Sequence, residues 1–461
     1  MKRYIFHLLT ISLASLLLLG CAARRPKPPI IEEPAEIAEP HPQALDHFIR
    51  GVIYDQQGEI TRAIAEYRRA LRYDSTSASI YLAMAEDYLA LKLYDDALGQ
   101  LYSALQIDST NADVLQFLGD LLVKMNLPDS AVCFIERLVR HHPDNVRYRQ
   151  NLAGVYIRLQ RLPEAIEQNE MILQQHPEHQ EALSQLSSLY IAQRDFEKAL
   201  EAAQKLYKLN PQDDRVCFTV ASLLAEQNRS TEADSFFAKA AEINPDDPRY
   251  FTNWAYLHMN DRNYARAAEI LDKGTFYHPT AAGIWALLGS AYQQAGQDSL
   301  ALEALDVSLE LDASQISPYI TMGFIYDNRG EPDKAIDIYD QALTIAPDDP
   351  LLLNNYAYLL AQKGIRLDEA MTMVEKALEA SPDNPSYLDT KGWIHFVRGD
   401  YPKALEYIQK ALEFDPKNAA IFDHLGDIYH VMGDFEKARA NWRQALEFDP
   451  ENISIREKLA R

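Results

Sequence analysis

The sequence predicts an all-α protein, a solenoid of about twelve helical hairpins, from three periodic features. A period of 34 residues runs from residue 44 to residue 452 and is broken once by a single extra residue. The eighth residue of every repeat is small: Gly51, Ala85, Gly119, Ala153, Ser187, Ala221, Ala255, Gly289, Gly323, Ala357, Gly392 and Gly426. The twentieth is alanine throughout: Ala63, Ala97, Ala131, Ala165, Ala199, Ala233, Ala267, Ala301, Ala335, Ala370, Ala404 and Ala438. A period of this length is typical of stacked helical repeats.

One repeat shows why each should fold as two antiparallel helices. Residues 322–347 contain two runs of apolar residues at helical spacing, and Gly330 interrupts the pattern between them. Small side chains at Gly323 and Ala335 let the two helices approach closely, and Pro347 ends the second helix. Because a single hairpin cannot bury its apolar side, neighbouring hairpins must stack into a solenoid.

With these residues the sequence resembles the tetratricopeptide repeat family over residues 44–452. The resemblance implies a right-handed superhelical solenoid that binds protein or peptide segments in a concave groove. Residues 453–461 start a further repeat, with Ile453 and Leu459 on one side of the expected helix and charged residues on the other. We therefore expect this segment to be a polar capping helix over the last hairpin.

The first residues have the pattern of a secretory signal, which we assign to residues 1–20. An apolar run of about sixteen residues follows Lys2 and Arg3, and a bilayer-spanning helix needs about twenty. The stretch Leu18-Leu19-Gly20-Cys21 resembles the lipobox of bacterial lipoproteins, which implies acylation of Cys21. An ordinary cleaved signal followed by a chance cysteine and an uncleaved membrane anchor are the two alternatives.

Residues 21–43 are predicted to be the acylated cysteine and a proline-rich tether. Residues 22–43 contain six prolines and four glutamates and lack helical or strand periodicity. An extended tether would span about 3.1 Å per residue, and plain disorder without a spacing role is the alternative. By resemblance to lipoproteins, Ala22 after the cysteine implies the outer membrane and the periplasmic side, in preference to the outer face of the inner membrane.

Composition and motifs restrict the function further. The net charge of −23 argues against nucleic acid as a main partner, because such binding depends on Lys and Arg. Cys133 and Cys217 should be several helices apart and therefore unlinked, with Cys217 a buried thiol. The sequence has no phosphate-binding loop, no catalytic serine or zinc-protease motif and no cysteine-rich metal spacing. We expect no enzymatic activity, no cofactor and no metal.

A recurring aromatic position is the first candidate partner site. The ninth residue is aromatic in repeats seven, nine, ten and eleven, and by the family's geometry it faces the groove. The predicted groove residues are Tyr256, Phe324, Asn328, Asn354, Tyr358, Asp389, Trp393 and Phe396. The aromatic side chains would anchor a partner, and the polar ones would bond an extended peptide backbone. The alternative is that the aromatic rings pack against the adjacent first helix.

A basic patch in repeat four is the second candidate. Arg147, Gln150 and Arg158 should lie on the groove side of the repeat's first helix, where an anionic partner segment could dock. The alternative is that the arginines offset neighbouring acids.

These patterns favour a lipid-anchored scaffold or adaptor that mediates protein–protein interactions in the bacterial cell envelope, in the assembly or export of envelope components. A soluble periplasmic adaptor, or a regulatory subunit of a cell-wall or polysaccharide enzyme, is the alternative. The expected partners are segments of other envelope proteins.

Overall fold

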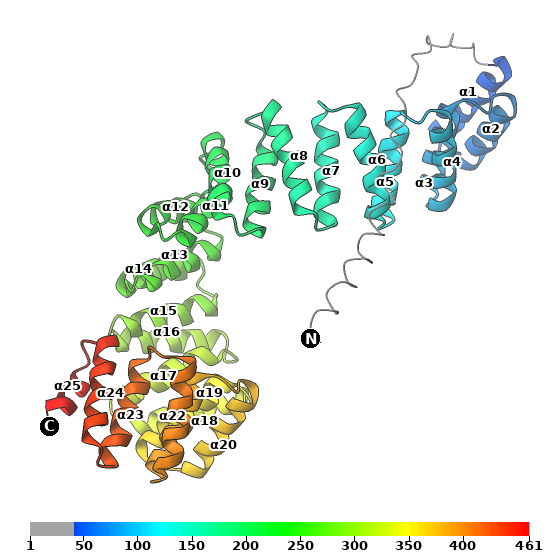
Figure 1. Ribbon diagram of the computed structural model, residues 1–461. Helices are drawn as coiled ribbons and strands as arrows, with labels where there is room; N and C mark the ends of the chain where they lie inside the picture. Colours follow the sequence, from blue (N-terminus) through cyan, green and yellow to red (C-terminus); the bar gives the residue numbers. More distant parts are fainter. Residues whose placement is uncertain (1–40, 461) are drawn as a thin grey trace, which may run out of the picture. The chain divides into compact units, whose positions relative to one another are not determined.

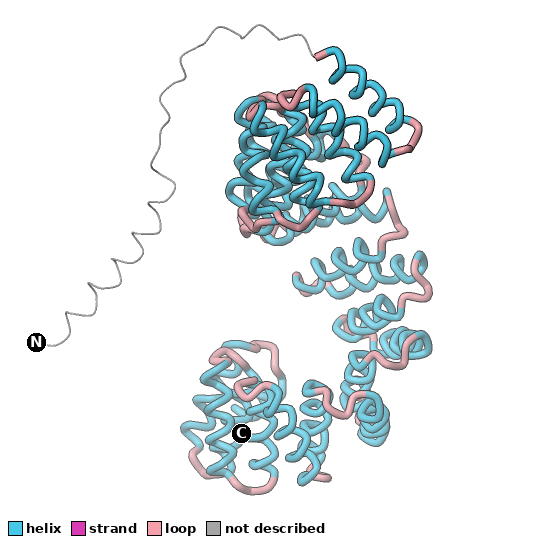
Figure 2. The backbone as a smooth tube through the Cα atoms, turned by 90° about the vertical axis from the view of Figure 1, so that its right-hand side faces the viewer, coloured by secondary structure: helices cyan, strands magenta, loops and turns pink. Residues whose placement is uncertain are grey.

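The structure, a computed structural model, describes residues 41–460. This range contains 25 α-helices and no strand, which confirms the predicted all-α fold (Figures 1 and 2). The predicted signal, Cys21 and nearly all of the tether lie outside the described residues. No helix within the described range is both long enough and apolar enough to span a membrane.

The chain divides into two compact units after Arg161. The N-terminal unit holds three complete hairpins and the first helix of repeat four. Its helices are α1 (Pro42–Gln56), α2 (Ile60–Tyr73), α3 (Ala78–Ala90), α4 (Tyr94–Ile107), α5 (Ala112–Lys124), α6 (Pro128–His141) and α7 (Val146–Arg158).

The C-terminal unit begins with the second helix of repeat four and continues through eight hairpins to a short last helix. Its helices are α8 (Leu162–Gln175), α9 (Gln180–Ala192), α10 (Phe196–Leu209), α11 (Asp214–Glu226), α12 (Ser230–Ile243), α13 (Pro248–Asn260), α14 (Tyr264–Tyr277), α15 (Ala282–Gln294), α16 (Asp298–Leu311), α17 (Ile316–Asn328), α18 (Pro332–Ile345), α19 (Pro350–Lys363), α20 (Leu367–Ala380), α21 (Pro385–Val397), α22 (Tyr401–Phe414), α23 (Ala419–Val431), α24 (Phe435–Phe448) and α25 (Ile453–Ala460).

Helices pair in the order that the repeat predicts. Within each unit, a repeat's first helix packs most extensively on its own second helix, and that second helix packs on the first helix of the next repeat. In the C-terminal unit, the first helices of successive repeats from α11 to α23 also touch; for example, α19 contacts both α17 and α21. Hydrogen bonds join neighbouring repeats: Tyr190 Oη donates to Glu170 Oε1 at 2.7 Å, and Trp254 Nε1 donates to Asp234 Oδ1 at 2.6 Å. The first helices therefore form one wall of the C-terminal unit.

The small eighth residue makes room for a large side chain of the second helix. A Cβ atom added to Gly323 would lie 2.5 Å from Cζ of Tyr339, closer than van der Waals contact allows. Gly51 faces Tyr67 and Gly426 faces Trp442 in the same way. The close approach predicted at Gly323 is thus a ring-over-glycine contact between α17 and α18.

The turn inside each hairpin uses a left-handed residue at the fifteenth position. Glycine holds it in six repeats, at Gly58, Gly296, Gly330, Gly364, Gly399 and Gly433. The other six repeats place a polar or charged residue there, at Lys92, Asn126, Gln160, Arg194, Asn228 and Arg262. The extra residue of repeat ten lies in the same turn, where Arg366 is a second left-handed residue two places after Gly364.

The last helix, α25, differs in detail from the expected cap. Ile453 is 70% exposed, whereas Ile455 is buried and joins the cluster around Trp442 together with Leu459. Lys458, expected on the outer side, places its Nζ 2.7 Å from both Asp423 Oδ1 and Asp427 Oδ2 of α23. The apolar side of the helix is thus defined by Ile455 and Leu459, which lie one helical turn apart.

Both cysteines of the described range are free thiols. Cys217 is fully buried on α11, as expected, and burial raises the pKa of its thiol. Cys133 is exposed on α6.

Candidate protein-binding site

Phe324 lies beside a hollow on the first-helix wall of the C-terminal unit. The side chain stands on α17, the residue is 50% exposed, and it borders a cavity of about 300 Å³ together with Tyr358 of α19. Asn328, one turn further along α17, borders the same cavity. The structure thus brings together three of the predicted groove residues, Phe324, Asn328 and Tyr358. We call this cavity, with the residues that line it, the Phe324 pocket.

The rim of the Phe324 pocket is rich in side-chain amides. They come from three successive first helices, α15, α17 and α19, and are Gln293, Gln294, Asn328, Asn355 and Gln362. Each amide offers donors and an acceptor without net charge. The carboxylate at the rim, Asp327, is neutralised by Lys363, whose Nζ lies 2.6 Å from Asp327 Oδ1. The pocket therefore combines an aromatic wall with an uncharged, hydrogen-bonding rim.

Tyr358 also belongs to a polar network that the sequence did not reveal. Its hydroxyl lies 3.3 Å from Nε2 of His424 on α23, and Nδ1 of His424 lies 2.9 Å from Oδ2 of Asp389 on α21. Burial alone would lower the pKa of His424, but the carboxylates of Asp389, Asp423 and Asp427 together outweigh burial and the pKa is raised. The imidazole is therefore held toward its cationic form. Burial and Asp389 raise the pKa of Tyr358 to about 12, so its phenol stays protonated.

Trp393 and Phe396 pack around this network. The Trp393 ring stacks on His424 with 4.3 Å between centroids and lies 4.7 Å from the Phe396 ring. Both residues are half-buried. Trp393 thus packs against the adjacent first helix, as in the alternative for these rings, whereas Tyr358 contacts the first helix two repeats further on. They stack or tilt against His424 and do not meet it edge-on.

The remaining predicted groove residues are separated from the pocket. Tyr256 is 51% exposed on α13, four repeat helices before α17. Asn354 is buried on α19, and its Oδ1 has no hydrogen-bond partner. Asp389 is buried and hydrogen-bonded to His424, so it is not available to bind a peptide backbone.

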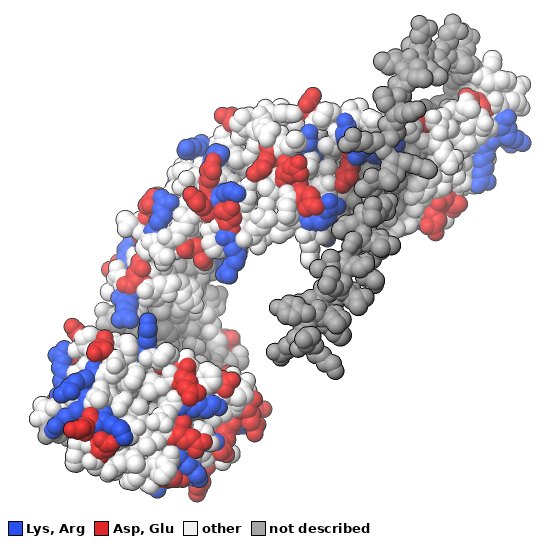
Figure 3. All heavy atoms as spheres, viewed as in Figure 1, with Lys and Arg blue, Asp and Glu red and all other residues white. Residues whose placement is uncertain are grey.

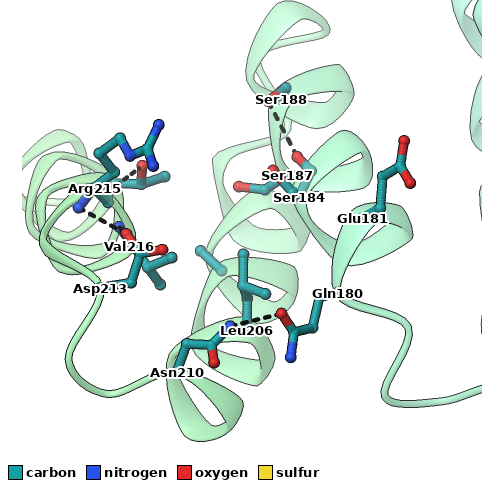
Figure 4. Close-up of a pocket in the computed structure, with 12 residues that line it drawn as sticks. Gln180, Glu181, Ser184, Ser187, Ser188, Leu206, Asn210, Asp213, Arg215 and Val216 are labelled. Carbon is teal, nitrogen blue, oxygen red and sulfur yellow. Dashed lines mark hydrogen bonds between the residues drawn. The ribbon is translucent and has the colours of Figure 1, made fainter.

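A second hollow lies between α9, α10 and α11 and is shown in Figure 4. Its volume is about 380 Å³, and Ser184, Ser187 and Ser188 are among the residues that line it. Asn210 Nδ2 donates to Gln180 Oε1 at 2.8 Å at its edge. Two of the serine hydroxyls donate to backbone carbonyls: Ser187 Oγ to Ala199 O at 3.2 Å and Ser188 Oγ to Ser184 O at 3.1 Å. No sequence signal singles out this hollow, because the eighth residue is small in every repeat and repeat eight also has small residues, Ala286 and Ser290, at the fifth and ninth positions.

The predicted basic patch lies on α7 of the N-terminal unit. Arg147 and Arg158 are exposed and Gln150 is half-buried. Burial raises the pKa of Asp120 on α5, and the charge of Arg147 opposes this rise. Arg147 therefore offsets a neighbouring acid, as the alternative to an anion-binding patch requires, and the docking of an anionic segment remains a prediction.

Within residues 41–460 no group of three or more His, Cys, Asp or Glu side chains is placed to hold a metal ion. The candidate sites are thus hollows and faces of packed helices, suited to binding a surface or a chain segment.

Comparison with known families defines the class of protein. A family model described as "Tetratricopeptide repeat" matches residues 170–449, more than half of the chain. A model described as "TPR repeat" matches residues 51–92, and one described as "Psidin, N-terminal TPR repeats region" matches residues 80–242. The chain belongs to the tetratricopeptide repeat family.

Among curated proteins, the chain is similar to the photosystem I assembly protein Ycf3 of Prochlorococcus marinus, with 36% identity over 84 residues. The match covers 18% of this chain and about half, 49%, of that relative.

Three solved structures resemble the chain at low identity. The Cut9–Hcn1 hetero-tetramer of APC/C is 14% identical, covers 91% of this chain and 96% of its own, and has a TM-score of 0.44. Naa15/Naa10 bound to HypK-THB is 17% identical, and the match covers 87% of this chain and 68% of that chain with a TM-score of 0.46. Yeast Tom70 is 16% identical, and the match covers 90% of this chain and 93% of that chain with a TM-score of 0.43.

Proposed function

We propose that this chain is a non-enzymatic scaffold that binds an extended segment of a partner protein in the Phe324 pocket. The observation that carries the proposal is the half-exposed Phe324 ring beside a hollow whose rim is formed by side-chain amides. Aromatic side chains at a recess are enriched among the residues that contribute most to protein binding.

The chemistry of the rim favours an uncharged, extended segment. Asn328, Asn355 and Gln362 can each donate to and accept from a peptide backbone. A cavity of about 300 Å³ accepts one or two apolar side chains next to Phe324. Because Lys363 neutralises Asp327, a charged partner side chain would gain little there and lose its hydration.

We further propose that the scaffold is anchored through acylated Cys21 to the outer membrane, faces the periplasm and serves the assembly or export of envelope components. The lipobox-like sequence supports the anchor. The name of the similar Ycf3 protein, an assembly protein, supports an assembly role. A soluble periplasmic adaptor, or a regulatory subunit of a cell-wall or polysaccharide enzyme, is the alternative.

Truncation of Phe324 tests the binding site. A photo-crosslinking residue at Asn328 first identifies the bound partner, and its affinity is then measured for the parent, for Phe324→Ala and for Phe276→Ala. Phe276 is a matched control because it is 79% exposed on a second helix, α14. We expect Phe324→Ala to lose about 2 kcal/mol or more, about thirty-fold in affinity, with unchanged helix content. Equal affinities of the two variants would refute the site.

Replacement of Cys21 tests the anchor independently. We expect the parent to partition into a detergent phase and to carry an acyl chain by mass spectrometry, and Cys21→Ser to do neither. Cys133→Ser is the control, since Cys133 is an exposed thiol of the repeats. A parent chain that partitions into water would favour the soluble adaptor.

A further inference from the structure

An aspartate occupies an apolar position of the repeat in α3. The tenth residue is apolar in the eleven other repeats: Ile53, Leu121, Val155, Leu189, Leu223, Leu257, Ala291, Ile325, Leu359, Ile394 and Ile428. In repeat two it is Asp87, which is only 3% exposed. Oδ2 of Asp87 is buried and has no hydrogen-bond partner when the carboxylates are ionised. A buried carboxylate in this state is costly, so its retention calls for a compensating group.

Three exposed carboxylates lie on the first helices of the N-terminal unit near Asp87. Asp55 on α1 and Glu86 on α3 act on Asp87 itself, and Asp113 on α5 lies near Glu86. We call these four residues the acidic face. A side-chain hydrogen bond joins Asp87 to Asp55, which directs the buried carboxyl toward the exposed one. Burial, with the charges of Asp55 and Glu86, raises the pKa of Asp87 to about 7. A proton shared between Asp87 and Asp55 thus offsets the cost of the buried charge, but only at low pH.

Among the ion pairs given for residues 41–460, none provides a cation to the acidic face. The ion pairs given by the structure within the N-terminal unit use Glu59, Glu66 and Asp46, and none includes a residue of the acidic face. Elsewhere basic and acidic side chains alternate, as Figure 3 shows for the visible face of the C-terminal unit. The carboxylates of the described range are also not grouped for a metal ion.

We propose that the acidic face binds a lysine- or arginine-bearing segment of a partner protein. A long cationic side chain can approach Asp55, Glu86 and Asp113 from solvent and replace the proton that Asp55 and Asp87 share. The opposite charges favour association and make it dependent on salt. This surface goes beyond the proposed function, because it lies in the other unit and does not depend on the Phe324 pocket.

Binding of defined peptides to the purified full-length chain tests the proposal. The probe is a labelled nonapeptide with four lysines separated by glycine and serine, and the comparison peptide carries four glutamines instead. Fluorescence anisotropy is recorded for the parent, for the double variant Glu86→Gln/Asp113→Asn, and for Asp95→Asn/Asp96→Asn. The last variant is a matched control, since Asp95 and Asp96 are exposed on α4 in the same unit and the charge change is equal.

We expect the parent to bind the lysine peptide and not the glutamine peptide. The affinity of Glu86→Gln/Asp113→Asn for the lysine peptide should be at least ten-fold weaker than that of the parent. The affinity of the control variant should lie within two-fold of the parent. Equal weakening of both variants would mean attraction by net charge and would overturn the proposal. A third variant, Arg24→Gln/Arg25→Gln/Lys27→Gln, separates the chain's own basic residues from a partner. If it binds the lysine peptide ten-fold more tightly than the parent, the acidic face is occupied by this chain itself and the partner assignment fails.

Discussion

Individual residues control how closely the two helices of a repeat approach. Gly323→Ala would place a methyl group against the Tyr339 ring, so we expect the free energy of unfolding to fall by about 1 to 3 kcal/mol, as for an overpacked core. Gly99→Ala is the control, because Gly99 lies inside α4 with nothing within 4 Å of its added Cβ, and alanine favours a helix by up to about 1 kcal/mol. Urea unfolding followed by circular dichroism measures both. A stability gain in Gly323→Ala would contradict the ring-over-glycine contact.

Asp87 should make the stability of the N-terminal unit depend on pH. It faces Asp55 of α1, Tyr67 of α2 and Glu86 of α3, and its pKa rises from the usual range to about 7. A raised pKa means that the folded state holds the proton more tightly than the unfolded state. The resulting stabilisation is fully present below the unfolded pKa of about 4, and it is lost as the pH rises through about 7.

The variant Asp87→Asn isolates this effect. The neutral amide can donate to Asp55 at any pH, so we expect it to stabilise the chain at pH 8 by about 1 to 3 kcal/mol and to change little at pH 5. Urea midpoints of parent and variant across this pH range give the difference directly. Parallel pH profiles would show that Asp87 does not titrate as proposed.

At the scale of elements, the last helix depends on a charge contact as well as on packing. Lys458 of α25 neutralises Asp423 and Asp427 of α23, and all three side chains are three-quarters or more buried. Lys458→Met keeps the apolar stem but leaves both carboxylates uncompensated. We expect a loss of about 1 to 2 kcal/mol, seen as faster hydrogen exchange in α25 and α23.

Lys437→Met provides the comparison. Lys437 pairs with Asp434 on the surface, where such a contact is worth less than about 1 kcal/mol. If the two variants exchange alike, the Lys458 contact is an ordinary surface ion pair.

At the scale of the whole molecule, stability is a sum of repeats and their interfaces. Each hairpin contacts its neighbours along the solenoid, so a local defect should spread only to adjacent repeats. We expect Gly323→Ala to speed hydrogen exchange in α16 to α19, while α1 to α6, in the N-terminal unit, exchange as in the parent. Uniform acceleration along the chain would instead indicate a single cooperative unit.

The repeat architecture follows from the spacing of residues along the chain, so it can be predicted from the sequence alone. A small residue at the eighth position and alanine at the twentieth recur because each hairpin needs the same close approach. Gly323 and Tyr339 show this approach in repeat nine. For the groove aromatics, the sequence shows only that they recur at the ninth position of several repeats, and it does not show how exposed each ring is. Of these, Phe324 and Tyr256 remain half exposed, whereas Trp393 is covered by His424.

Tertiary packing alone decides which polar residues meet. Tyr358 and His424 are 66 positions apart, and Asp389 and His424 are 35 apart, so no repeat pattern relates their side chains. The burial of Asp87 likewise depends on the neighbouring helices that surround it. A periodic sequence specifies the contacts that every repeat shares, because those contacts recur at fixed spacing. Contacts found once depend on the three-dimensional positions of several helices, and the binding surfaces are built from them.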